Sequence, residues 1–193
     1  MDSARRLFNQ HGFEPVSIDQ IMGEAGLTRG GFYHYFKSKD ELYAAAVSSF
    51  QSCNPFRERV ADMPPSQLKP PRLARLLIDL YLSDEVLADS RQHCPLYALP
   101  SDVARAGLAP RQAYTDLIRS MSSVFTAALA GARDGARRAQ TIVSLCVGGM
   151  VLARTTNDAE LRKSLRMAAR HQALELLGEQ GRRKTSRSAA APS

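Results

Sequence analysis

The sequence lacks the features that mark membrane and secreted proteins. Its longest apolar stretch, residues 142–153, is interrupted by a glycine pair and is shorter than the roughly 18 residues that a membrane-spanning helix needs. The first fifteen residues have no apolar core of the kind found in signal peptides. The three cysteines are widely spaced and odd in number, which argues against a disulfide framework. We therefore expect a cytoplasmic protein with no membrane partner.

Catalytic and cofactor-binding motifs are also missing. The sequence contains no HExxH, GxSxG or Walker pattern and no GxGxxG after a strand. Its four histidines are scattered and form no metal-binding pattern. We therefore expect no catalytic residue, no metal and no cofactor, and we look for a binding function.

The positive charge is concentrated in the second half of the chain. The net charge is +7, but residues 1–50 carry 5 Lys and Arg against 6 Asp and Glu, a net of −1. Residues 151–193 carry 9 against 4. The high isoelectric point alone is therefore weak evidence for nucleic-acid binding, and that case depends on local pattern.

Helical periodicity runs through the whole chain and predicts an all-α fold. Four short helices fit into the first 50 residues, with Gly12 and Gly26 ending the first two. Capping boxes are expected at Ser17, with Gln20 three residues on, and at Ser38 with Glu41. Thr28 can cap the helix between them. This region is expected to be a compact unit.

Prolines divide the rest of the chain. Four of them lie in residues 62–71 and mark a boundary. The pattern then predicts an amphipathic helix around residues 73–81, short helical turns near Pro95 and Pro100, a long helix whose first residue is Pro110, and helices at about 136–155 and 158–178. The predicted domains are residues 1–50, residues 51–179 and a disordered basic tail, residues 180–193.

Two helices joined by a short turn at Gly26 predict a helix-turn-helix, whose second helix would enter the major groove of DNA. That helix, residues 28–36, begins with Gly30 and Gly31, each of which costs up to about 1 kcal/mol relative to alanine. Either the backbone approaches something bulky, such as the edge of DNA, or the helix start simply tolerates glycine.

The aromatic residues behind the glycines divide by face. Phe32 and Phe36 share one face and suit a small core. Tyr33 lies beside that face and can offer its hydroxyl to a phosphate, whereas His34 and Tyr35 point toward the groove. The side chains of Lys37 and Lys39 follow where the chain leaves the helix, in place for phosphate contacts.

The stretch "SIDQIMGEAGLTRGGFYHYFKSKDEL" resembles the N-terminal DNA-binding domain of TetR/AcrR-type transcriptional regulators. The resemblance covers about residues 4–50, and family members usually carry more residues before their first helix, so that helix is expected to be truncated here. The resemblance implies phosphate contacts at Tyr33 and Lys39 and, through helix N-termini, at Ser17 and Thr28. It implies contacts with base edges at Arg29, Gly30 and His34, where Arg29 could pair with guanine.

The resemblance also implies a homodimer on a palindromic operator in double-stranded DNA, with a C-terminal domain for ligand binding and dimerisation. The last two long helices would pair with their copies. The expected interface residues are Ile142, Cys146, Gly149, Ala153, Leu165, Ala169 and Leu176. The alternative is that these apolar stripes only close the core of the monomer.

The middle helices would form a pocket for a small-molecule effector. Expected lining residues are Tyr81, Cys94, Tyr97, Tyr114, Met121, Phe125 and Met150, a mixture that suits a hydrophobic or aromatic ligand with a few polar groups. Plain core is the alternative for each of them. Cys94, beside His93, could instead be a redox or electrophile sensor, although a buried, inert cysteine is the usual case.

The sequence therefore predicts a ligand-responsive regulator, most simply a repressor that an effector releases from its operator. The main alternatives are a redox-sensing regulator that uses Cys94 and a helical partner-binding module that does not bind DNA. A partner-binding module would explain the amphipathic helices but not the exposed aromatic and basic residues between positions 29 and 39.

Overall fold

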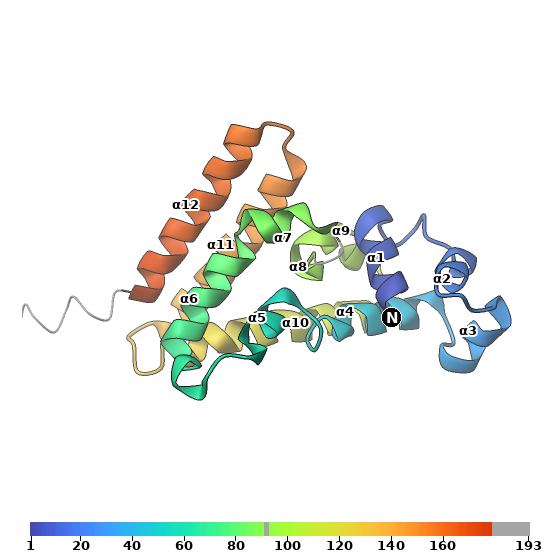
Figure 1. The fold of residues 1–193 in the computed structure, drawn as a ribbon, viewed down its shortest axis with the longest axis horizontal. Coiled ribbons are helices and arrows are strands. Elements are labelled where there is room, and N and C mark those ends of the chain that lie inside the picture. The colour runs from blue at the N-terminus through green and yellow to red at the C-terminus, as the bar shows by residue number, and fades with distance from the viewer. Residues whose placement is uncertain (91–92, 179–193) are drawn as a thin grey trace, which may run out of the picture. The chain divides into compact units, whose positions relative to one another are not determined.

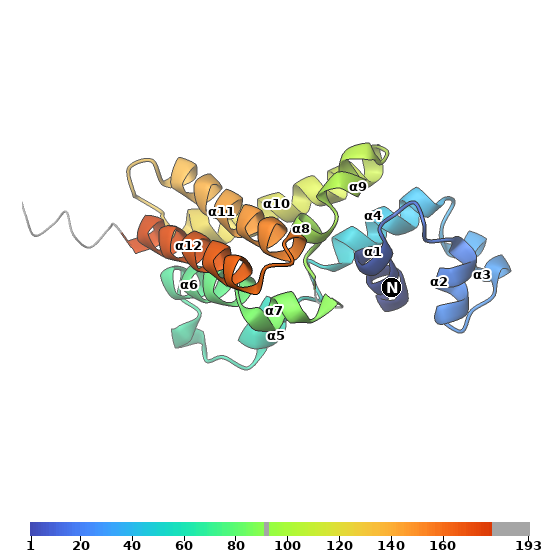
Figure 2. The ribbon, with the colours of Figure 1, turned by 90° about the horizontal axis from the view of Figure 1, so that it is seen from above.

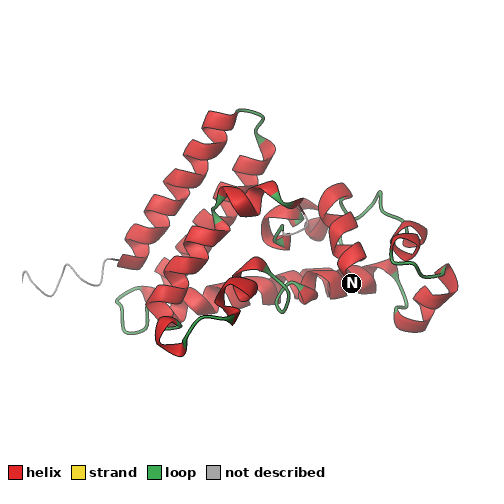
Figure 3. Ribbon diagram, viewed as in Figure 1, coloured by secondary structure: helices red, strands yellow, loops and turns green. Residues whose placement is uncertain are grey.

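The computed structural model describes residues 1–90 and 93–178, and this part of the chain contains helices and connecting loops but no strand (Figures 1 and 3). The predicted all-α class is confirmed. The first helices are α1 (Asp2–His11), α2 (Ile18–Glu24), α3 (Arg29–Tyr35), α4 (Lys39–Ser49) and α5 (Pro55–Ala61). They are followed by η1 (Pro65–Gln67), α6 (Pro70–Tyr81), α7 (Asp84–Ala88), α8 (Pro95–Ala98), α9 (Pro100–Arg105), α10 (Leu108–Ala128), α11 (Gly135–Thr155) and α12 (Ala159–Gly178).

The chain packs into two compact units. Unit 1 comprises Met1–Ala61 and Asp84–Ser120, and unit 2 comprises Asp62–Ser83 and the chain from Met121 onward. The predicted domains, residues 1–50 for DNA binding and residues 51–179 for ligand binding and dimerisation, are defined by function. This division stays a prediction. The predicted disordered tail, residues 180–193, lies outside the described residues.

The core of unit 1 is aromatic. Phe8 of α1 and Tyr43 of α4 are fully buried, and their ring centroids lie 4.9 Å apart in an edge-to-face arrangement. Phe13 packs against Tyr43 at 4.7 Å between centroids. Such ring pairs add to the stabilisation that comes from burial alone. They fix α1 against α4, while α2 packs on α1 and α3 packs on α2.

The core of unit 2 is built on α11 and α12, which lie side by side in both views (Figures 1 and 2). Ile142, Cys146, Met150 and Ala153 of α11 have no exposed surface. Helix α12 also packs on α6, where the guanidinium of Arg170 is 2.8 Å from the carboxylate of Asp79.

Most predicted helices are confirmed to within two residues. The long helix begins at Leu108 instead of Pro110; proline fits anywhere in a first helical turn, because the amides there have no partner within the helix. Helix α5 was not predicted. It is only seven residues long and has no buried residue, so its apolar pattern is too short to identify a helix. Among residues 1–90 and 93–178, no helix is long and apolar enough to span a bilayer.

Candidate nucleic-acid interface

Helices α2 and α3 form the predicted helix-turn-helix (Figure 1). Ser17 caps α2: its hydroxyl accepts a hydrogen bond from the amide of Gln20 at 3.1 Å, and its own amide donates to the Gln20 side chain at 2.7 Å. This confirms the predicted capping box. Gly26 then takes a φ of +68°, a left-handed conformation that glycine adopts without penalty. The turn is closed by the amide of Leu27, which donates to the carbonyl of Met22 at 2.8 Å.

The second predicted capping box is only half formed. The hydroxyl of Ser38 accepts from the amide of Glu41 at 3.1 Å, as expected. The Glu41 carboxylate, however, accepts from the amide of Lys37 at 2.7 Å and not from Ser38. Ser38 still caps α4 through its hydroxyl. The acidic side chain of Glu41 in the first turn adds a favourable interaction with the helix dipole. Thr28 occupies the N-cap position of α3 but makes no capping hydrogen bond through its side chain.

Helix α3 is fixed by one aromatic residue and exposes three others. Phe32 is 1% exposed, whereas Tyr33 and Tyr35 are 57% and 71% exposed. His34 is also exposed and meets Tyr35 edge to face. Phe36 is half-buried and packs beside Phe32 at 5.8 Å between centroids. The predicted division of the rings between core and surface is therefore what the structure has.

The glycine pair of α3 is not required by packing within the molecule. A Cβ atom at Gly30 would meet no atom within 4 Å. One at Gly31 would lie 3.8 Å from Met22 Cε and Thr28 Oγ1, which is ordinary contact. The helix therefore carries the conformational cost of two glycines without any internal need for them.

Two predicted DNA-contacting cations are held by neighbouring groups. Arg29 donates to the Asp19 carboxylate at 2.8 Å, with both side chains more than half exposed. Lys39 Nζ donates to the carbonyl of Glu14 at 3.2 Å and lies 4.2 Å from the centre of the Phe13 ring. Asp19, Glu14 and Phe13 are not predicted as part of the site from the sequence, since no local spacing joins them to their partners.

The charges of residues 1–50 are largely paired with one another. All three arginines of this region form ion pairs: Arg5 with Asp2, Arg6 with Glu24, and Arg29 with Asp19. In the described part of the chain neither Lys37 nor Lys39 has an acidic partner. The net charge of −1 therefore hides two cations, at the end of α3 and the start of α4, that are not neutralised by a carboxylate.

The predicted dimer-interface residues are mostly interior. Ile142, Cys146, Gly149 and Ala153 of α11 are fully buried in the single chain, as is most of Ala169 in α12. A Cβ atom at Gly149 would lie only 2.8 Å from Ala169 Cβ. Leu165 and Leu176 are half-buried. The close approach that small residues allow is thus made between α11 and α12 of one chain. The assignment of these residues to a dimer interface stays a prediction.

The predicted pocket residues fall in both units. Tyr81, Met121, Phe125 and Met150 are buried in unit 2. In unit 1, Cys94 and Tyr97 are buried and Tyr114 is half-buried. The Tyr114 hydroxyl donates to the carbonyl of Leu96 at 2.7 Å, and burial raises the pKa of Tyr114 to about 12. Their assignment to one effector pocket stays a prediction.

The cysteines differ in exposure. Cys53 is exposed, whereas Cys94 and Cys146 are buried. Burial raises the pKa of the Cys146 thiol to about 12, which makes it unreactive at neutral pH. Within residues 1–90 and 93–178, no group of His, Cys, Asp and Glu could hold a metal ion.

Comparison with known proteins agrees with this geometry. Residues 1–46 match the model of the "Bacterial regulatory proteins, tetR family". The chain is 51% identical over 45 residues to the transposon Tn10 TetC protein of Escherichia coli, a match that covers 23% of each chain. The aligned segment thus spans about a quarter of the length of that curated relative.

Solved structures resemble most of the chain in fold. A TetR-family transcriptional regulator from Agrobacterium tumefaciens has a TM-score of 0.68 at 18% identity, covering 89% of this chain and 95% of its own. The regulator FadR from Bacillus subtilis, in complex with stearoyl-CoA, has a TM-score of 0.59 at 18% identity and covers 91% of this chain and 94% of its own. Residues 1–46 therefore carry the N-terminal motif of the TetR family of bacterial regulatory proteins, and most of the chain shares the fold of solved TetR-family regulators.

Proposed function

We propose that this protein regulates transcription by inserting α3 into the major groove of an operator. The observation that carries the proposal is the exposed face of α3. Tyr33, His34 and Tyr35 stand in solvent on a helix that is anchored by Phe32, and large exposed rings are costly unless they serve a partner. The N-terminal part of a recognition helix reads bases in this motif, while tyrosine and lysine side chains contact phosphates.

The roles of the individual residues follow from their positions. Arg29 begins α3 and is oriented by Asp19, so it would contact a base edge once DNA replaces that exposed carboxylate. Gly30 lets the backbone approach the groove. Lys39 is already positioned by Phe13 and Glu14, so little side-chain entropy would be lost when it binds a phosphate.

We further propose a homodimer, because one recognition helix reads only a few base pairs and a two-fold axis doubles the site. Most of the predicted interface residues on α11 and α12 are already covered within the single chain. The same helices also expose three apolar side chains: Leu152 on α11 and Leu161 and Met167 on α12 are 54%, 47% and 48% exposed. We place the dimer contact there, where burial of these side chains would stabilise association.

A small hydrophobic or aromatic effector would control binding. The apolar character of the predicted pocket residues supports this ligand class, as does the neighbour of known structure that binds stearoyl-CoA. The effector would change the spacing of the two recognition helices, with a coupling free energy of about 1–3 kcal/mol between the two sites. Repression relieved by the effector is the direction that we infer from the family.

The redox-sensing alternative gains no support, because Cys94 is only 4% exposed and a sensing thiol needs access to its oxidant.

One experiment distinguishes DNA binding from the partner-binding alternative. Genomic fragments are retained on the protein at near-physiological salt and sequenced, with the wild type and the Tyr33→Phe/Lys39→Gln variant run in parallel.

A short palindrome enriched by the wild type and lost by the variant would support the proposal. Both substituted side chains are largely outside the core, so the variant should stay folded, which circular dichroism can check. No enrichment by the wild type would overturn the proposal and favour the partner-binding module. Equal enrichment by both proteins would contradict the assigned surface.

A further inference from the structure

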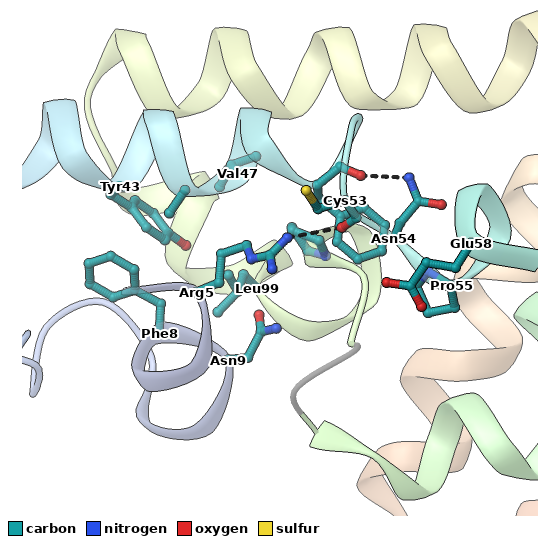
Figure 4. A pocket seen from close by; sticks show the side chains of 13 residues that line it. Arg5, Phe8, Asn9, Tyr43, Val47, Cys53, Asn54, Pro55, Glu58 and Leu99 are labelled. Carbon is teal, nitrogen blue, oxygen red and sulfur yellow. Dashed lines mark hydrogen bonds between the residues drawn. The ribbon is translucent and has the colours of Figure 1, made fainter. Parts of the chain in front are cut away.

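Unit 1 contains a small pocket that the proposed function does not use. It lies between α1, α4 and the segment from α8 into α9 (Figure 4). Its volume is about 60 Å³, enough for about four to six water-sized groups. The apolar wall is formed by Phe8, Val47, Phe50 and Leu99. None of the predicted effector-pocket or DNA-contacting residues lines it.

The hydroxyl of Tyr43 faces this pocket without a hydrogen-bond partner. The Tyr43 residue has no exposed surface, and its oxygen is among the buried polar atoms that no group in the structure satisfies. Figure 4 shows this oxygen directed toward the interior of the pocket. Burial raises the pKa of Tyr43 above its usual value, so the phenol stays protonated and remains a donor. Unsatisfied buried donors are uncommon in folded proteins and are costly.

Arg5 offers a second donor at the same place. Its Nη1 donates to the carbonyl of Cys53 at 2.9 Å, and its Nη2 donates to the Asp2 carboxylate at 2.8 Å. Its Nε is buried and has no partner. Nε and Nη2 share one edge of the planar guanidinium, the edge that binds a carboxylate through two parallel hydrogen bonds. Asp2 is 91% exposed, so its hold on Nη2 is weak and easily exchanged.

We propose that this pocket binds a short-chain monocarboxylate of about four to six heavy atoms, such as acetate, propionate or butyrate. The carboxylate accepts hydrogen bonds from the Tyr43 hydroxyl and from the Nε edge of Arg5. The alkyl chain lies on the apolar wall. Glu58 also lines the pocket, but it is exposed, and water screens its charge from the bound anion.

The pocket is connected to a DNA-contacting residue through packed rings. The ring of Tyr43 meets Phe13 at 4.7 Å between centroids, and Lys39 Nζ lies 4.2 Å from the centre of the Phe13 ring. A ligand that fixes the Tyr43 hydroxyl therefore biases the position of Phe13 and, through it, that of Lys39. This second step rests on the proposed function, whereas the binding site itself does not.

Binding is tested first, without DNA. The full-length chain is titrated calorimetrically with sodium acetate, propionate and butyrate at constant ionic strength, with propionamide as the uncharged control. The site predicts saturable binding of propionate with a Kd of the order of 1 mM, and binding of propionamide at least about tenfold weaker, because the amide lacks the charge that strengthens these hydrogen bonds.

Two variants assign the site. Tyr43→Phe removes only the hydroxyl and should weaken propionate binding about tenfold, whereas the control Tyr114→Phe, whose hydroxyl lies outside the pocket lining, should bind as the wild type does. Arg5→Lys keeps the charge but loses the planar edge and should also weaken binding. The proposal is overturned if propionate binds no better than chloride, or if Tyr43→Phe binds it with wild-type affinity.

The coupling is tested on an operator fragment retained in the genomic selection. Propionate should change the affinity of the wild type for this fragment and leave that of Tyr43→Phe unchanged. An unchanged wild-type affinity would overturn the coupling and leave the site standing. Because the calorimetry contains no DNA, a chain that binds no operator at all would refute the proposed function without affecting the ligand site.

Discussion

Two helices of this protein each contain a pair of glycines, and one member of each pair, Gly149 in α11 and Gly30 in α3, shows the opposite surroundings of the other. In α11, a Cβ atom at Gly149 would lie 2.8 Å from Ala169 Cβ and 3.4 Å from Leu82 Cδ2. In α3, a Cβ atom at Gly30 would have no neighbour within 4 Å. Packing inside unit 2 therefore requires glycine at position 149, whereas nothing inside unit 1 requires it at position 30.

The side chains around the two pairs follow the same division. Helix α11 turns its apolar stripe inward, with Ile142 and Cys146 fully buried. Helix α3 keeps only Phe32 inside and leaves Tyr33 and Tyr35 in solvent. A helix that buries its apolar residues needs no further partner to explain them, whereas one that exposes large rings and carries unneeded glycines calls for a partner outside the molecule.

The largest effect is expected from filling the space at Gly149. Gly149→Ala should lower the free energy of unfolding by about 1–3 kcal/mol, because its Cβ atom overpacks the contact between α11 and α12. The measurement is urea denaturation followed by circular dichroism. Gly148→Ala is the matched control: a Cβ atom at Gly148 meets nothing within 4 Å, so its stability should be unchanged or higher. Equal losses in both variants would contradict the close approach described for Gly149.

A change at Lys39 should affect DNA binding and leave stability nearly unchanged. In the proposed homodimer, Lys39→Gln removes two phosphate contacts, one from each protomer, so affinity for the operator should fall at least about tenfold. The slope of log K against log salt should become shallower by about 1.8, which is about 0.9 for each contact. Fluorescence anisotropy at several salt concentrations measures both quantities. Lys163→Gln, at an exposed position on α12, should leave the slope unchanged, and a similar change in both variants would show that Lys39 acts only through net charge.

Tyr114 and Tyr43 of unit 1 provide a smaller contrast. Tyr114→Phe should lower the free energy of unfolding by about 1 kcal/mol, since the carbonyl of Leu96 loses its hydrogen bond. Tyr43→Phe should cause no loss, because its hydroxyl has no partner to leave behind. Thermal or chemical denaturation without added carboxylate separates the two. If Tyr43→Phe lowers the free energy of unfolding as much as Tyr114→Phe does, the Tyr43 hydroxyl has a hydrogen-bond partner and this contrast is wrong.

The sequence predicted the N-terminal helices well because their signals are local. Ser17 and Gln20 lie one helical turn apart, and the left-handed Gly26 follows α2 directly. Contacts between distant positions could not be predicted in this way. Two such contacts join separate elements: the ion pair of Arg29 with Asp19, and the contact of the Lys39 ammonium with the face of the Phe13 ring.

The apolar stripe of α11 also shows what sequence periodicity cannot predict. Its periodicity identified the buried face correctly but did not say which surface covers it. The sequence was compatible with a copy of the chain or with α12, and the structure places Ala169 of α12 against Gly149. Periodicity reports burial, and only three-dimensional packing reports the partner.

The most direct test of the account is to measure Gly30→Ala in two ways. Its free energy of unfolding should be unchanged or up to about 1 kcal/mol higher, because alanine is the better helix former and has room at this position. Its affinity for an operator fragment retained in the genomic selection should fall tenfold or more, because the added methyl group meets the DNA. Wild-type affinity in a fully folded variant would contradict the claim that α3 presents this backbone to the groove.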